Sequence, residues 1–166
     1  MKTFNSIAAF AEYLQFRGLE TARELQHGLE RAAVMVERTA KSEIGTYQPE
    51  VGPFQAWDPL DPATIEDRVR QGFTPDDPLL RTGKLRESIS HRVAPGEAVI
   101  GSTSNIAAYQ ELGTSRIPPR PFLGPAVVRN ERRIVDLIGA TFVNGIAGGQ
   151  RIHPALNYDM KLDEEK

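Results

Sequence analysis

The residue types that could bind a metal or transfer protons are scattered along this chain. His27 has Glu24 and Glu30 three residues to either side, a spacing that places them on one face of a helix. His91 and His153 lie far away in the sequence, and none of the histidines shows the H-E-x-x-H spacing of a zinc site. A solvated charge cluster is therefore favoured over a metal site at His27.

Other patterns give equally little support for catalysis. The acidic residues at positions 58, 61, 66 and 67 could pair for glycoside hydrolysis, but acids at the start of a helix also complement its dipole. No serine lies in a G-x-S-x-G turn, and the segment RTGK at 81–84 lacks the earlier glycine of a phosphate-binding loop. The sequence predicts no catalytic residue, no cofactor and no metal, and hence a protein that is not an enzyme.

A better candidate for a functional segment is the proline-arginine loop, residues 113–122, which reads GTSRIPPRPF. Its prolines hold the backbone extended, so little entropy is lost when a partner binds. Arg116 and Arg120 can make forked contacts to carboxylate or phosphate. Arg120 stands between prolines and cannot lie in a central strand, so its side chain is predicted to point outward.

These observations define a predicted subunit or partner interface. Two of its aromatic members have alternatives: Trp57 either folds back onto the core or anchors a contact, and Phe122 either fills the core or serves as an apolar anchor. The arginines after the loop continue its basic character. The predicted interface comprises Trp57, Arg116, Pro119, Arg120, Phe122, Arg129, Arg132 and Arg133.

Composition limits the class of protein. The 166 residues suit one domain, with 40% apolar and 25% charged residues, as in ordinary globular chains. A net charge of −2 does not favour a dedicated nucleic-acid binder. There is no apolar run long enough for a bilayer, no typical signal peptide and no cysteine. The protein is expected to be made in a cytoplasm and to form no disulfide.

Apolar residues at helical spacing predict a helical N-terminal region over 3–45, with a break at Gly18 and a left-handed stop at Gly45. The apolar face of its longer part either packs on the core or packs against a neighbouring subunit. Prolines and glycines make 46–61 a loop. Asp61 followed by Pro62 predicts a helix start, with the helix running to Gln71.

The second half alternates short elements. Thr82 is expected to cap a helix over 83–87, and strands are expected over 88–94 and 97–102 around a Pro95-Gly96 turn. A helix over 106–112 should stop at Gly113. A final helix should begin at Pro125 and end at the glycines 145, 148 and 149.

The predicted fold class is α+β, in which long N-terminal and C-terminal helices pack on a small antiparallel sheet, with a long proline-rich loop. The predicted organisation is an N-terminal helical extension over 1–18, a single domain over 19–148 and a C-terminal arm over 149–166.

Three segments together form a recognisable pattern: LLRTGKLRESI at 79–89, VIGSTSNIAAYQELGT at 99–114 and PPRPFLGPA at 118–126. Upstream, WDPL at 57–60, Thr64-Ile65 and Gly72 fit the same pattern. The combination, which covers about residues 54–126, resembles the head–tail joining and tail-completion proteins of long-tailed bacteriophages, most nearly the Mu-type virion morphogenesis proteins.

The resemblance implies a structural virion protein of the phage neck, without catalysis or cofactor, that works in a ring of six or twelve copies. Implied partners are the adjacent neck connector and the tail terminator or tube proteins, with DNA passing only through the lumen and no membrane. The implied location is the virion, after assembly in the host cytoplasm. An alternative, based on the residues alone, is a small adaptor that binds acidic partners through the proline-arginine loop.

Overall fold

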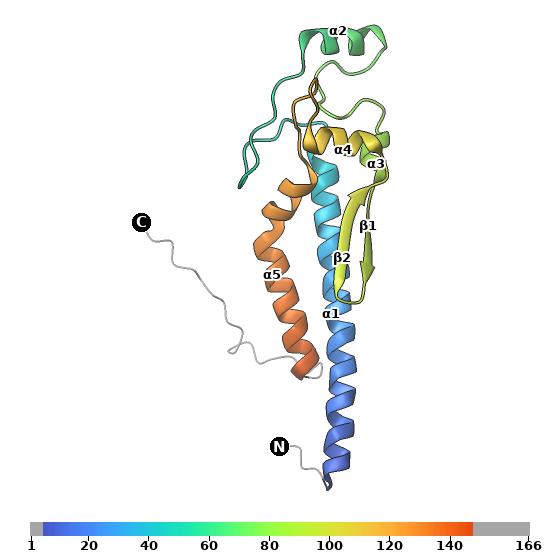
Figure 1. Ribbon diagram of the computed structural model, residues 1–166, viewed down its shortest axis with the longest axis vertical. Helices are drawn as coiled ribbons and strands as arrows, with labels where there is room; N and C mark the ends of the chain where they lie inside the picture. Colours follow the sequence, from blue (N-terminus) through green and yellow to red (C-terminus); the bar gives the residue numbers. More distant parts are fainter. Residues whose placement is uncertain (1–4, 148–166) are drawn as a thin grey trace, which may run out of the picture.

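The computed structural model describes residues 5–147, and these form an α+β fold (Figure 1). The predicted fold class is confirmed. In chain order the elements are α1 (Ile7–Glu43), α2 (Pro62–Arg70), α3 (Lys84–Ser88), β1 (Ile89–Ala94), β2 (Glu97–Ser102), α4 (Asn105–Leu112) and α5 (Leu123–Ala147).

Helix α1 is one uninterrupted helix, so the break predicted at Gly18 is wrong. Ser6 caps its start, because its side chain accepts a hydrogen bond from the backbone N–H of Ala9. A single glycine costs only about 1 kcal/mol in a helix, and the strong helix formers on both sides outweigh it. The predicted stop is confirmed: α1 ends at Glu43, and Gly45 has a φ of 102°. Residues 7–17, predicted to be part of a separate N-terminal extension, therefore belong to α1 itself.

The hairpin matches the prediction. Strands β1 and β2 are antiparallel, and their register runs from Ile89 opposite Ser102 to Ala94 opposite Glu97. Pro95 and Gly96 form the two-residue turn, and Gly96 adopts the positive φ of 78° that such a turn favours in glycine.

Helix α1 lies between the hairpin and α5 (Figure 1). The prediction that both long helices pack on the sheet therefore needs correction, because α5 packs along α1. Two glycines allow the helices to approach closely: a Cβ at Gly28 would lie 2.6 Å from Thr141 Oγ1, and one at Gly145 would lie 2.6 Å from the Cα of Thr21. The apolar face of α1 thus serves mainly to hold α5 and the hairpin.

Helix α5 begins at Leu123, two residues before the predicted start at Pro125, and it continues through Gly145. The other two glycines predicted to end it, Gly148 and Gly149, lie outside the described residues. So does the predicted arm over 149–166.

The loop over 46–61 contains only a short bridge between Val51 and Phe54. Asp61 caps α2 as predicted, accepting from the N–H of Ala63 at 2.8 Å, with Pro62 in the first turn. Arg68 of α2 is buried and donates to the carbonyls of Thr74 and Leu80 at 2.7 and 2.6 Å. This arginine fastens α2 to the chain that leads into α3.

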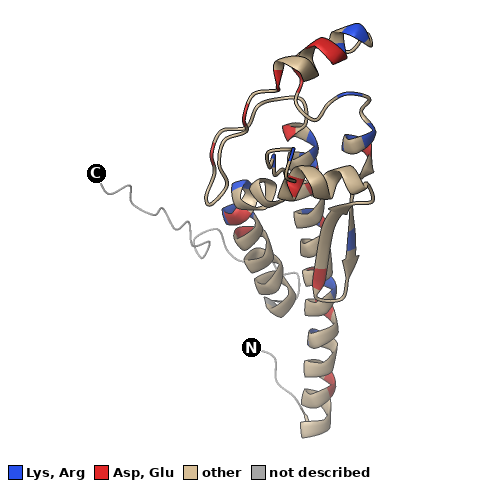
Figure 2. Ribbon diagram, turned by 45° about the horizontal axis from the view of Figure 1, so that its top comes forward, with Lys and Arg blue, Asp and Glu red and all other residues tan. Residues whose placement is uncertain are grey.

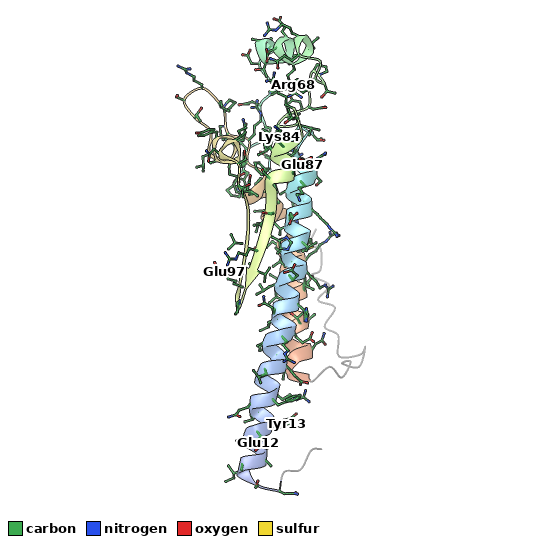
Figure 3. All side chains as sticks on the ribbon, turned by 90° about the vertical axis from the view of Figure 1, so that its right-hand side faces the viewer. Glu12, Tyr13, Arg68, Lys84, Glu87 and Glu97 are labelled. Carbon is green, nitrogen blue, oxygen red and sulfur yellow. The ribbon has the colours of Figure 1, made fainter. Side chains whose placement is uncertain are left out.

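The hydrophobic core lies at the C-terminal end of α1, where the hairpin, α4 and the start of α5 meet. Its buried members are Val36, Ala40, Ile44, Trp57, Leu85, Ile89, Ala107, Phe122 and Ala126. The N-terminal part of α1 lies away from this core and extends past the hairpin (Figure 3, near Glu12 and Tyr13). In residues 5–147 no helix combines the length and apolarity needed to cross a bilayer.

Candidate functional site around the proline-arginine loop

The proline-arginine loop leaves α4 through a tight turn. Thr114 closes this turn, because its Oγ1 accepts from the N–H groups of Arg116 and Ile117 at 3.2 and 3.1 Å, and its own N–H donates to Ile117 O at 2.8 Å. Gly113 has a φ of 73°, and a Cβ there would lie 3.1 Å from Ile117 O. Only glycine fits this position without strain.

Arg120 does not point outward, so the prediction for this residue is wrong. It is 6% exposed, and its guanidinium donates to Asp58 O at 3.0 Å and Pro59 O at 3.1 Å. Its backbone N–H donates to Gln110 O at 2.6 Å. The physical reason is that the loop before α2 has carbonyls without sheet partners, and a buried guanidinium supplies several donors at once.

Trp57 and Phe122 are also internal. Trp57 is 5% exposed and donates from Nε1 to Pro121 O at 2.9 Å, so it folds back onto the core. Phe122 is 0% exposed and fills the core. Within one copy, these two aromatic residues and Arg120 join the two loops to each other and are not available to a partner. We call this set of contacts, together with Glu111, the junction.

Glu111 is the member of the junction that the sequence did not reveal. Its carboxylate accepts from the backbone N–H groups of Phe122 at 2.8 Å, Leu123 at 3.1 Å and Gly124 at 3.0 Å. It therefore caps the start of α5 with a negative charge, where the helix dipole favours one. Sequence rules look for a cap next to the helix, whereas this cap comes from α4.

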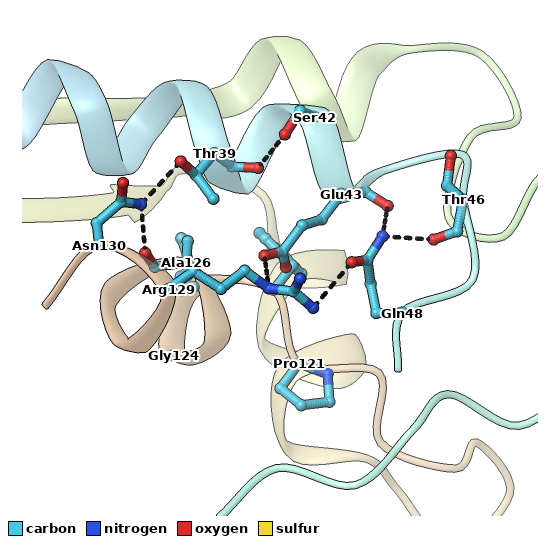
Figure 4. Close-up of polar contacts among 12 residues, drawn as sticks. Thr39, Ser42, Glu43, Thr46, Gln48, Pro121, Gly124, Ala126, Arg129 and Asn130 are labelled. Atoms are coloured by element: carbon cyan, nitrogen blue, oxygen red, sulfur yellow. Dashed lines mark hydrogen bonds and ion pairs between the residues drawn. The ribbon is translucent and has the colours of Figure 1, made fainter. Parts of the chain in front are cut away.

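A second polar cluster lies beside the junction (Figure 4). Arg129 Nε lies 3.1 Å from Glu43 Oε1, and its Nη2 donates to Gln48 Oε1 at 3.1 Å. Gln48 in turn donates to the carbonyls of Glu43 and Thr46. Arg129, predicted to face a partner, is thus used inside the copy, although it remains exposed on one side.

Glu43 is unusual because its carboxylate is buried with incomplete pairing. It is 3% exposed, and among the described residues neither of its carboxylate oxygens has a hydrogen-bond partner, so Arg129 contributes an ion pair only. Burial raises the pKa of Glu43 to about 7, the positive charge of Arg129 opposes this shift, and Glu111 adds to it. This carboxyl group therefore titrates near neutral pH.

Besides Arg129, the predicted interface residues that remain on the surface are Arg116, Pro119, Arg132 and Arg133. Arg116 lies at the edge of a cleft of about 750 Å³ between the loop before α2, α3 and the proline-arginine loop. Arg81 and Lys84 lie at the same cleft, with Leu60 and Ile106 among its apolar lining. Its charged groups are mostly basic, so this basic cleft suits an acidic group next to an apolar one.

The sequence predicted a charge cluster at His27, but the histidine that contacts two carboxylates is His91. His27 is exposed, whereas His91 lies on β1 between two acids of α1, with Nδ1 in contact with Glu37 and Nε2 3.0 Å from Glu30. Both hydrogen bonds raise the pKa of His91 above its ordinary value of 6.5, and the bond to Glu30 has the larger effect. The described part of the chain contains no group of three or more possible metal ligands.

Comparisons with known proteins found no matching family model, no matching curated protein and no matching solved structure.

Proposed function

We propose that this chain is a structural protein of a tailed phage or prophage, acting at the neck in head–tail joining or tail completion as a subunit of a ring. The sequence pattern described above suggests the proposal. The structure adds support of a physical kind, because it shows what the residues of that pattern do.

One observation carries the proposal: several residues of the pattern, from segments far apart in the sequence, come together at the junction and in the core next to it. Trp57, Leu80 and Phe122 come from three separate segments and pack in or against one core cluster. Gly113 provides the turn, and the N–H groups at 122–124 bind Glu111. Most of these residues therefore hold the fold together. Such a use of a sequence pattern is typical of a structural protein.

The distribution of charged and apolar surface on the subunit supports the proposed ring. Charged side chains gather around α2, α3 and the proline-arginine loop, whereas residues 137–147 of α5 carry none (Figure 2). A closed ring needs two different complementary surfaces on each copy. Apart from the basic cleft, this subunit has two separate apolar helix surfaces, one on the N-terminal part of α1 and one on the C-terminal part of α5, that can serve as such a pair.

The test is localisation in particles together with the mass of the isolated protein. A tagged copy should be found by electron microscopy at the head–tail connection of virions, in association with connector and tail terminator or tube proteins. The purified protein should have a mass that is a multiple of 18.4 kDa, six-fold or twelve-fold for a complete ring. The neck function would be excluded if virions lacked the tagged copy and the purified protein did not bind the connector, tail terminator or tube proteins.

The basic cleft favours a second candidate, an adaptor that binds acidic partners. Arg116 and Lys84 are exposed at its edge, although Arg120 is no longer available for this role. An adaptor should be small in solution and should bind an acidic peptide with an affinity that falls in Arg116→Ala. A ring subunit without such binding would exclude the adaptor.

A further inference from the structure

Two apolar stripes lie on the surface of a single copy. The first, the α1 stripe, consists of Ile7, Ala11, Leu14 and Gly18, which recur every three or four positions along the N-terminal part of α1. Ile7 is 89% exposed and Leu14 is 52% exposed. Residues at this spacing form one continuous face of a helix, and here Ile7 and Leu14 supply its large apolar side chains.

The α1 stripe continues the face of α1 that holds α5. Farther along the same face, Thr21 meets Gly145 and Gly28 meets Thr141. Helix α5 ends at Ala147, and the described chain covers nothing of α1 beyond it on this face (Figures 1 and 3). The α1 stripe therefore has the character of a helix–helix contact surface, but without a second helix among residues 5–147.

The second, the α5 stripe, consists of Val135, Gly139, Phe142 and Ile146. Val135 is 65% exposed, Phe142 47% and Ile146 57%. Phe142 follows Thr141, so it lies about 100° around the helix from the side that contacts α1. Residues 137–147 contain no charged side chain, and this part of α5 is uncharged in Figure 2.

We propose that the α5 stripe of one copy packs against the α1 stripe of a second copy. The two stripes match in length and spacing: 7, 11, 14, 18 and 135, 139, 142, 146 both step by four, three and four residues. Each therefore extends over roughly 16 Å of helix. Each includes a glycine with open space around it, Gly18 and Gly139, at which two helix backbones can approach closely.

The surface next to the α1 stripe has room for the partner's large side chain. Leu14 and Gly18 line a groove of about 590 Å³ together with Leu25. Ile146, the last residue of the α5 stripe, borders this groove at the place where α5 ends, whereas the rest of the α5 stripe lies on a different surface. The aromatic ring of Phe142 from a second copy fits the apolar lining of this groove. Because the two stripes are different surfaces, the contact is heterologous, and repeating it generates a ring or a filament instead of a closed pair.

This inference rests on the proposed function in one respect, since a ring makes a second copy the natural occupant. Its test uses the mass of the full-length protein in solution, measured by light scattering after size-exclusion chromatography. The two blocking variants are Leu14→Glu and Phe142→Glu, each of which puts a charge in the middle of one stripe. We expect each variant alone to have the single-copy mass of 18.4 kDa, while the unaltered protein has a multiple of it.

Mixing the two variants is the decisive step. Leu14→Glu still presents an intact α5 stripe, and Phe142→Glu still presents an intact α1 stripe. An equimolar mixture should therefore form a pair of twice 18.4 kDa and nothing larger. Ile7→Glu and Val135→Glu should repeat this result, which guards against one variant that fails to fold.

The matched control is Phe16→Glu. Phe16 is 58% exposed on the same helix, but it lies about 200° from Leu14, on the opposite side of α1. This variant should keep the mass of the unaltered protein. Circular dichroism should show the same helix content in all variants.

Three results would overturn the inference. The first is a single-copy mass for the unaltered protein at tens of micromolar. The second is loss of assembly in Leu14→Glu but not in Phe142→Glu, which indicates a contact between two α1 stripes. The third is a blocking variant with a lowered melting temperature but the same mass as the unaltered protein, which indicates that each chain covers its own stripes. The neck function is tested separately, by looking for the protein in virions. If the protein is absent from virions and does not bind the connector, tail terminator or tube proteins, the neck function is excluded, but the masses measured in solution still test the contact between the two stripes.

Discussion

The guanidinium of Arg120 lies against the carbonyl oxygen of Asp58, with Nη2 at 3.0 Å and Nε at 3.3 Å, and so ties together two loops that are 62 residues apart. The same Nη2 reaches Pro59 O at 3.1 Å. This relationship changes the role of the most prominent charged residue of the proline-arginine loop. Arg120 holds the fold together, and the surface of the loop is left to Arg116.

Arg120→Ala is expected to lower the free energy of unfolding by about 2 kcal/mol, because hydrogen bonds to a charged group are lost and carbonyls lose their donor. Chemical denaturation measures this loss. Arg116→Ala is the matched control, since Arg116 is exposed, and it should change stability by less than about 0.5 kcal/mol. Equal stability of the two variants would contradict the internal role of Arg120.

Glu111→Ala is expected to destabilise the protein by about 1–2 kcal/mol, because three N–H groups at the start of α5 lose their acceptor. Glu111→Gln should lose less, since the amide oxygen still accepts. Hydrogen exchange should accelerate at residues 122–124 in both variants. Unchanged exchange there would show that the cap contributes nothing to the start of α5. Glu131→Ala, an exposed acid on α5, serves as control.

Stability should depend on pH through Glu43. Its pKa rises from about 4.5 in the unfolded chain to about 7 in the folded one, so the folded state binds a proton more tightly. The stabilisation is complete below pH 4.5 and is lost as the pH rises to 7, with a slope of at most about 1.4 kcal/mol per pH unit. Glu43→Gln should flatten this part of the profile in thermal melts between pH 4.5 and 7.5. A slope that persists in Glu43→Gln would assign it to another group.

His91 should titrate above its ordinary value. Its contacts with Glu30 and Glu37 raise its pKa above 6.5. The stabilisation it gives is therefore fully present below pH 6.5 and is lost as the pH rises through the folded-state pKa. NMR titration of the imidazole measures this pKa directly. Glu30→Gln should bring the pKa down toward 6.5, whereas Glu24→Gln, outside the contact, should leave it unchanged.

Local signals in the sequence predicted much of this fold. Asp61 before Pro62 marks a helix start, and Pro95-Gly96 marks a turn, because both signals act through adjacent backbone atoms. Gly18 misled the prediction because a single glycine does not decide the fate of a long helix. The rest depended on partners distant in sequence. Arg120 binds a carbonyl 62 positions away, and His91 contacts Glu30 61 positions away. Neither contact could be predicted from the spacing of residues along the chain.

The isolated protein is expected to form no stable complex with duplex DNA near physiological salt. Of the three arginines on the first half of α5, Arg129 is paired with Glu43, which leaves Arg132 and Arg133 for phosphates. Each phosphate contact contributes a slope of only about −0.9 in the logarithm of affinity against the logarithm of salt concentration, so the two contacts that α5 can make give weak binding. A gel shift at submicromolar protein in about 150 mM salt would contradict this, since binding in such salt needs many phosphate contacts. Arg132→Glu with Arg133→Glu should then abolish that shift, and the role of α5 would move from passive passage to retention of DNA.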